Sequence, residues 1–134
     1  MEIEHSDAVS AKIIQCIIRV HQTLGPGYRE IVYKRSLLIE LRRLPFDIQV
    51  EKEVFIFYEG VRVGRHVIDI IVDRRILIEL KTVDALNKAH YAQVKSYLKA
   101  TGLPFGLLVN FQRELADYRH VRSPHRRSNP HISI

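Results

Sequence analysis

The first part of the chain places apolar residues at helical spacing. One helix is predicted over residues 7–24, with Ser6 or Asp7 as its N-cap and Gly25-Pro26-Gly27 ending it. Its apolar stripe consists of Val9, Ile13, Cys16, Ile17, Val20 and Leu24. A second helix is predicted from about Tyr28 to Leu44. Its apolar arc contains Tyr33, Leu37, Leu41 and Leu44.

From residue 48 the pattern becomes that of strands, rich in β-branched and aromatic residues. Glu59-Gly60 is a turn signal inside this region. The predicted strands form an antiparallel meander at about residues 48–58, 61–72 and 75–81.

A further helix and strand follow the meander. Asn87 can cap a helix that runs through Ala100 and closes at Gly102. As a crossover, this helix would lay a buried strand, Phe105–Asn110, alongside the sheet. A weaker strand is predicted at about residues 115–121, so the chain combines helices with one sheet in an α/β arrangement.

The composition is that of one globular domain. The chain has 134 residues, with 46% hydrophobic and 27% charged residues, and we expect one domain over residues 1–122. Residues 123–134 contain two prolines and no periodicity, which predicts a flexible basic tail. No apolar run approaches a membrane span and the N-terminus is acidic, so a cytoplasmic protein without membrane contact is expected.

Charge and cysteine content narrow the function classes. The net charge of +6 favours polyanionic partners, although many proteins with such a charge never bind nucleic acid. Cys16 is the only cysteine, which excludes disulfide frameworks and cysteine-zinc sites. Its place in an apolar helix predicts a small buried hydrophobe rather than a catalytic thiol.

Three charged residues interrupt two neighbouring apolar strands. Asp69 lies within VIDIIV, and Glu79 and Lys81 lie within ILIELK. Burying a lone carboxylate costs several kcal/mol unless it is paired, protonated or bound to a metal. Two interpretations are therefore open: a buried ion pair in which Lys81 is the partner of Asp69, or a site that holds a divalent cation beside a phosphate.

The loop between these strands makes a register prediction. If Asp73-Arg74-Arg75 is a three-residue loop, residue 72 pairs with 76 and residue 69 with 79. Because side chains alternate along a strand, that register places Asp69 and Glu79 on the same face. A two-residue loop would place them on opposite faces.

Polar residues on two helices are further candidates. Glu30 falls inside the apolar arc of its helix, where it is either a first-turn residue that complements the helix dipole or an inward-facing site residue. His90, Gln93 and Tyr97 share one face of the later helix. They form either a solvated polar stripe or part of the site that follows the Glu-x-Lys strand.

Taken in order, these residues resemble the PD-(D/E)XK nuclease superfamily, in particular its RecB-like branch. The segment Gly27-Tyr28-Arg29-Glu30-Ile31-Val32-Tyr33 is similar to the signature of the small bacterial GxxExxY proteins of that superfamily. The resemblance implies a restriction-endonuclease-like core, with a central mixed sheet flanked by helices. Ile68 precedes Asp69, where the motif has proline.

The resemblance also implies the roles of individual residues. Asp69, Glu79 and the Leu80 backbone carbonyl would bind Mg²⁺ or Mn²⁺, with Glu30 as the helix-borne acidic residue. Lys81 would be the catalytic lysine, and Gln93 and Tyr97 would belong to the RecB-type helix motif. His90 has no defined place in the family pattern and is a candidate for positioning nucleic acid.

The function expected from these residues is metal-dependent hydrolysis of phosphodiester bonds, with DNA favoured over RNA. Two alternatives belong to other classes. One is a catalytically silent module with a nuclease fold that binds nucleic acid or protein within a repair or defence assembly. The other is a dimerising protein with a purely structural ion pair. A homodimer or larger complex is compatible with each of them.

Overall fold

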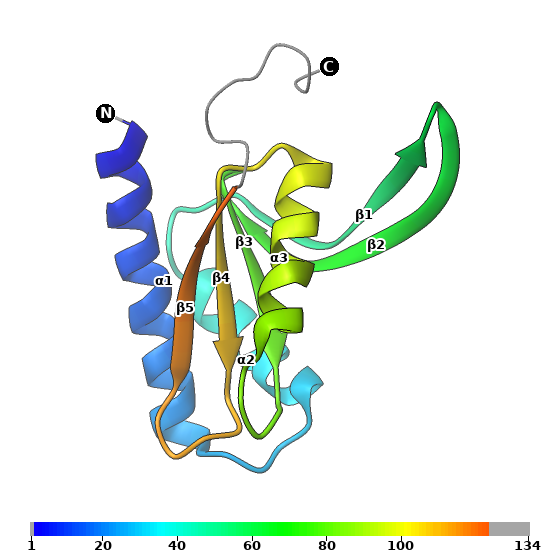
Figure 1. The fold of residues 1–134 in the computed structure, drawn as a ribbon. Helices are drawn as coiled ribbons and strands as arrows, with labels where there is room; N and C mark the ends of the chain where they lie inside the picture. The colour runs from blue at the N-terminus through cyan, green and yellow to red at the C-terminus, as the bar shows by residue number, and fades with distance from the viewer. Residues whose placement is uncertain (1, 124–134) are drawn as a thin grey trace.

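A computed structural model describes residues 2–123, with side chains from residue 8 onward, as five strands and three helices (Figure 1). The elements are α1 (Glu2–Leu24), α2 (Glu30–Leu41), β1 (Ile48–Tyr58), β2 (Val61–Val72), β3 (Ile76–Lys81), α3 (Lys88–Thr101), β4 (Phe105–Asn110) and β5 (Asp117–Arg122). The strands form one sheet in chain order, β1-β2-β3-β4-β5. Only β3 and β4 pair in parallel, and the other three pairs are antiparallel.

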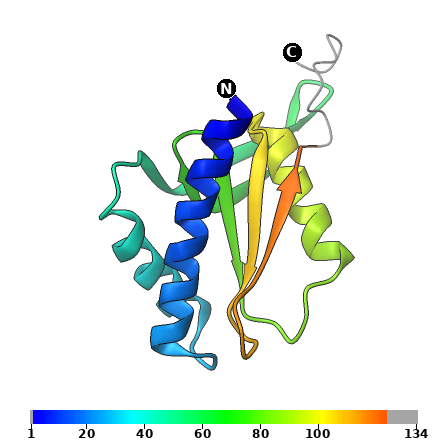
Figure 2. The ribbon, with the colours of Figure 1, turned by 90° about the vertical axis from the view of Figure 1, so that its left-hand side faces the viewer.

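The sheet lies between two helical layers, which bury apolar residues on both of its faces. On one face, α1 and α2 pack against a cluster that includes Ile70, Ile78 and Leu80, called here the α1/α2 core. On the other face, α3 packs against a smaller cluster that includes Ile71 and Leu77, called the α3 core. Figure 2 shows the sheet between α1 and α3. The predicted mixed sheet flanked by helices is therefore confirmed.

The predicted register of the central hairpin is also confirmed. Strands β2 and β3 pair Val72 with Ile76 and Ile70 with Ile78, so the loop between them has three residues. Asp73 and Arg74 have φ angles of 53° and 55°. Two consecutive left-handed residues give the backbone twist that a tight hairpin requires. One step beyond the last pair, the same register places Asp69 opposite Glu79.

Several predicted boundaries are wrong. Helix α1 begins at Glu2, so Ser6 and Asp7 lie inside it instead of capping it. Helix α2 begins at Glu30, with Arg29 as its N-cap residue, and ends at Leu41, where the prediction ran to Leu44. The error at its start has a local cause, because Gly25 and Gly27 adopt φ angles of 69° and 111° and hold the chain out of helical geometry.

Strand alternation is broken near Asp69. Ile70 lies in the α1/α2 core, whereas Ile68, two residues earlier, lies in the α3 core. The residue opposite this break on β1 is Glu51, whose φ angle of 53° is unusual for a strand residue. Strict alternation, on which the sequence prediction relied, therefore does not hold at Asp69. The break makes Asp69 accessible to side chains from both layers.

Beyond this point the β1–β2 hairpin projects away from the helices (Figure 1). It exposes several large apolar side chains at its outer end: Phe57, Tyr58, Val61 and Val63. Within the described part of the chain, no helix is long and apolar enough to cross a membrane. The predicted basic tail lies outside the described residues, except for Ser123.

Candidate functional site

The candidate site lies where β2 and β3 separate, and Asp69 is its first acidic residue. The backbone amide of Leu80 donates a hydrogen bond to Asp69 Oδ2 at 3.2 Å. Asp69 Oδ1 lies 3.5 Å from the ammonium nitrogen of Lys34, which comes from α2. The Asp69 side chain is 16% exposed. It therefore contacts the backbone of β3 and a cation from the α1/α2 layer at the same time.

Glu79 is the second acidic residue and is more deeply buried. The residue is only 7% exposed, and within the described chain its Oε1 is the one buried side-chain polar atom without a hydrogen-bond partner. Burial, followed by the Asp69 charge, raises the Glu79 pKa to about 8, against the opposing effect of Lys81. An orphaned carboxylate oxygen in a buried position is costly, so this atom points to a missing cation or donor.

Lys81 lies between Glu79 and α3. Its ammonium nitrogen is 3.6 Å from Glu79 Oε2 and donates a hydrogen bond to Gln93 Oε1 at 2.8 Å. Leu77 packs in the α3 core, so Glu79 and Lys81 continue along the side of β3 that faces α3. The ion-pair interpretation had Lys81 as the partner of Asp69, whereas the described cation partner of Asp69 is Lys34.

Glu30 lies at the rim of the site, at the first position of α2. It is exposed at the first position of the helix, where the prediction had it facing inward. Partial desolvation, followed by the charge of Asp69, raises the Glu30 pKa, while Lys81 and Lys34 lower it. These electrostatic interactions place Glu30 near the other two carboxylates.

Tyr33, three residues after Glu30, holds the loop that precedes α2. It is fully buried, and its hydroxyl donates to the Gly25 carbonyl at 2.6 Å and accepts from the Tyr28 amide at 3.1 Å. Its ring stacks on Phe111 with centroids 4.5 Å apart. A buried tyrosine thus anchors the loop from which α2 starts, and this fixes the position of Glu30.

Two of the three α3 candidates reach the site. Gln93 binds Lys81, as described above. Tyr97 is 6% exposed, and its ring centroid lies 4.5 Å from that of His66 on β2. Burial, with Glu79 and Asp69 as further causes, raises the Tyr97 pKa to about 12. The hydroxyl is therefore a neutral group near the carboxylates at physiological pH.

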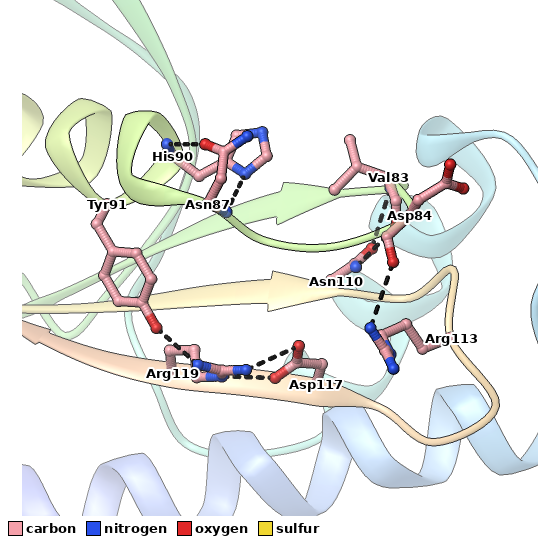
Figure 3. Close-up of polar contacts among 9 residues, drawn as sticks. All are labelled: Val83, Asp84, Asn87, His90, Tyr91, Asn110, Arg113, Asp117 and Arg119. Atoms are coloured by element: carbon pink, nitrogen blue, oxygen red, sulfur yellow. Dashed lines mark hydrogen bonds and ion pairs between the residues drawn. The ribbon is translucent and has the colours of Figure 1, made fainter.

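The third candidate, His90, has a structural role. Its Nδ1 accepts a hydrogen bond from the Asn87 amide, and its own amide donates to Asn87 Oδ1 (Figure 3). This reciprocal pair is a capping box that satisfies free amides at the start of α3. The predicted N-cap at Asn87 is confirmed. A role for His90 toward nucleic acid stays a prediction.

Asn110 is a residue that the sequence prediction assigned only to a strand. It is completely buried at the end of β4, paired with Lys81 in the parallel register. Its side chain donates to the Val83 carbonyl and accepts from the Val83 amide (Figure 3). It also accepts from the Gln112 amide. The loop after Lys81 is thereby fixed to the end of β4. The sequence did contain a signal for this role, because Asn110 is a polar residue at the end of an otherwise apolar run.

Lys34 and Glu51 were also missed. Lys34 follows Glu30 by one helical turn, so periodicity alone could have placed both on the side of α2 that reaches the site. The Lys34 ammonium donates to Glu51 Oε2 at 3.1 Å. Glu51 gave no signal in the sequence, because its orientation depends on a left-handed backbone conformation within a strand.

Comparison with known proteins identifies the family of this chain. The family model of the PD-(D/E)XK nuclease superfamily matches residues 7–122. The chain belongs to the PD-(D/E)XK nuclease superfamily. A search of curated proteins gives no significant match.

Among solved structures, this superfamily member resembles the crystal structure of SSO0001, with a TM-score of 0.50 and 18% sequence identity. The match covers 84% of this chain and 66% of that one, just under two thirds of its length. At this level of identity the likeness concerns the fold alone.

Members of the PD-(D/E)XK superfamily typically use a divalent metal, and the donor set here fits one. Asp69, Glu79 and Glu30 offer hard oxygen ligands, and Glu79 Oε1 lacks a partner. No group of three acidic, histidine or cysteine side chains in residues 8–123 is gathered closely enough to enclose a metal by itself. Mg²⁺ usually takes one or two protein carboxylates and keeps several waters.

A polar cavity of about 720 Å³ opens between the β3–α3 and β4–β5 loops. Its lining contains Arg113 and Arg119 together with Asp84, Glu114 and Asp117. Arg119 is already engaged by Asp117 and by the Tyr91 hydroxyl (Figure 3). None of the candidate site residues lines this cavity. Its mixed charge gives it no preference for an anion.

Proposed function

We propose that this protein is a metal-dependent nuclease that hydrolyses phosphodiester bonds in DNA, in the cytoplasm. The observation that carries the proposal is the buried Glu79 Oε1, which has no hydrogen-bond partner and lies beside Asp69 and Lys81. A cation supplied by the site would satisfy that atom and offset the repulsion between the carboxylates. Superfamily membership supports the same chemistry.

In this proposal Asp69, Glu79 and the Leu80 carbonyl hold the metal, and Glu30 acts from the rim, directly or through water. When bound, Mg²⁺ or Mn²⁺ would polarise the phosphodiester and neutralise the charge that develops during the reaction. Asp69 is positioned for this role by the Leu80 amide, which fixes one of its oxygens. Glu79 must lose its proton before it can bind a cation.

Lys81 is proposed to orient the attacking water as the ammonium, or to take its proton as the neutral amine. Its ammonium is fixed by Gln93 on one side and Glu79 on the other. A lysine held at two points loses less freedom during the reaction than a free one. Gln93 therefore acts as a positioning residue for Lys81, and Tyr97 supplies a neutral buried hydroxyl near the carboxylates.

Within the superfamily we assign the chain to the GxxExxY group. The hydrogen bonds of Tyr33 support this assignment, because they connect the tyrosine of that signature to its glycine-containing loop, next to the glutamate. The tyrosine holds the loop, and the loop sets the start of the helix that carries Glu30.

The experiment that tests the proposal is incubation with labelled single-stranded DNA, duplex DNA, flap DNA and RNA, each with Mg²⁺, Mn²⁺ or EDTA. We expect cleavage of at least one DNA substrate with metal and none with EDTA. Cleavage of RNA alone would correct the substrate class. Binding without metal-dependent cleavage of any substrate would contradict the proposed catalysis.

A second candidate is a catalytically silent binding module with this fold. It is favoured by the observation that Asp69 and Glu79 each have a lysine within ion-pairing distance. Such pairs would neutralise the carboxylates without a metal. The same cleavage experiment separates the two candidates, because the binding module would retain nucleic acid and leave it intact.

A further inference from the structure

The structure contains a second lysine at the acidic site, and its environment is unusual. Lys34 is a buried residue whose side chain is 9% exposed, and no catalytic step described above uses it. Its ammonium nitrogen lies 3.1 Å from Glu51 Oε2 and 3.5 Å from Asp69 Oδ1. One cation is thus shared between a proposed metal ligand and a second carboxylate that has no role in the metal site.

The two contacts of Lys34 are unequal. The contact with Glu51 is a hydrogen bond, whereas the longer contact with Asp69 is an ion pair only. Asp69 Oδ2 is held separately by the Leu80 amide. Oδ1 is therefore the atom for which Lys34 and a divalent cation compete, and Glu51 draws the lysine away from it.

The backbone conformation of Glu51 supports a functional role for its contact with Lys34. Glu51 has a φ angle of 53° and lies between the pairs Val50–Ile70 and Lys52–Ile68, opposite Asp69. A non-glycine residue in the left-handed region is strained relative to ordinary strand geometry. In this conformation its carboxylate reaches Lys34, although 63% of the side chain remains exposed.

We propose that Lys34 is an internal counter-cation for Asp69 that competes with the divalent metal, and that Glu51 is a positioning residue that holds Lys34 and so keeps Asp69 available. This inference rests on the metal site of the proposed function. Lys34 occupies Asp69 when no metal is present, which limits carboxylate repulsion in the empty site. Glu51 sets how readily the metal displaces it.

The two residues are expected to have opposite effects on metal affinity. Lys34→Met removes the competitor and should lower the Kd for Mn²⁺ by about tenfold. Glu51→Gln releases Lys34 toward Asp69 and should raise the Kd by about tenfold, at the lower end of what changes around a metal's ligands produce. In the Lys34→Met background Glu51→Gln should have little effect, because Glu51 acts only through Lys34.

The test is calorimetric titration of the metal-free full chain with Mn²⁺ for the wild type, both single variants and the double variant. Lys95→Met and Glu59→Gln are matched controls that remove the same charges from exposed positions on α3 and the hairpin turn. Melting curves in EDTA check that each variant folds. If Lys34→Met does not fold, Lys34→Gln, which keeps a polar side chain without the charge, replaces it in the same set of variants.

The outcomes distinguish the inference from the function on which it rests. A wild type that binds neither Mn²⁺ nor Mg²⁺ would overturn the metal site and this inference together. A wild type that binds Mn²⁺, with Lys34 and Glu51 variants that match their controls, would overturn the inference alone. Equal effects of Glu51→Gln with and without Lys34 would also overturn it, because they would show a general charge effect.

Discussion

The backbone amide of Leu80 lies 3.2 Å from the Asp69 carboxylate, to which it donates a hydrogen bond. This bond fixes the acidic residue of β2 beside the Glu-x-Lys segment of β3, beyond the last backbone pair of the two strands. The separation of the strands creates room for side chains, and the bond prevents Asp69 from moving away. The relative positions of Asp69, Glu79 and Lys81 follow from it.

A divalent metal is expected to stabilise the folded protein. Glu79 and Asp69 disfavour each other's charge, so a bound cation should raise the melting temperature, equivalent to about 2.7 kcal/mol when free ion is roughly 100 times its Kd. Asp69→Asn should remove most of that gain. Melting curves over millimolar Mg²⁺ and Mn²⁺ measure it. Unchanged curves for the wild type would favour the purely structural ion pair.

The metal-free protein should become more stable when Glu79 is replaced by Gln at pH 8. The Glu79 pKa lies at about 8 in the folded chain, above its ordinary value of 4.5. Below pH 4.5 both states are protonated, but as pH rises toward 8 the unfolded chain ionises first, so folding stability declines. Glu79→Gln avoids this loss.

Melting curves in EDTA at pH 4.5 and pH 8 measure this difference. We expect Glu79→Gln to gain at least about 3 °C relative to wild type at pH 8, roughly the shift that 1 kcal/mol produces in a domain of this size, and less at pH 4.5. Glu59→Gln, at the exposed hairpin turn, is the control. A Glu79→Gln protein less stable than wild type at pH 8 would mean that Lys81 holds Glu79 ionised.

Lys81→Ala should separate catalysis from binding. If Lys81 orients the water or transfers its proton, the single-turnover cleavage rate should fall by about 10²–10⁴-fold, while affinity for the substrate changes little. Lys95→Ala, on the exposed face of α3, is the control. Cleavage by Lys81→Ala at the wild-type rate would remove Lys81 from the mechanism without excluding a nuclease.

Tyr33→Phe should destabilise the fold, although the ring remains. The hydroxyl makes two hydrogen bonds to the loop before α2, and their loss leaves part-buried backbone groups unpaired, at a cost of about 1–3 kcal/mol. Urea unfolding measures this change. Tyr91→Phe is the matched control, since the Tyr91 hydroxyl bonds an exposed arginine. Equal stability of the two variants would contradict an anchoring role for Tyr33.

The sequence predicted the sheet and its central register because these depend on local patterns. Apolar alternation and a three-residue loop were sufficient to pair Val72 with Ile76, and hence to bring Asp69 near Glu79. Asn87 likewise had a recognisable capping position. These features are determined within a few residues of one another.

The parts of the site that were missed depend on long-range or backbone effects. Nothing in the sequence indicates that Glu51 adopts a left-handed conformation and reaches Lys34. Lys81 was the candidate partner of Asp69 in the ion-pair interpretation because the two lie on neighbouring strands, whereas the structure supplies Lys34 from a helix. Glu30 was predicted to face inward because it shares the helical arc of Tyr33 and Leu37, whereas it lies exposed at the first residue of α2.

The Asp69–Glu79–Lys81 site is proposed to hydrolyse nucleic acid with the help of a divalent metal. The single-turnover cleavage rates of wild type and Glu79→Gln on one DNA substrate, with Mn²⁺ and with EDTA, test this proposal most directly. We predict cleavage by wild type only with Mn²⁺, and loss of both metal binding and cleavage in Glu79→Gln. Equal cleavage by the two proteins, or cleavage in EDTA, would contradict the account.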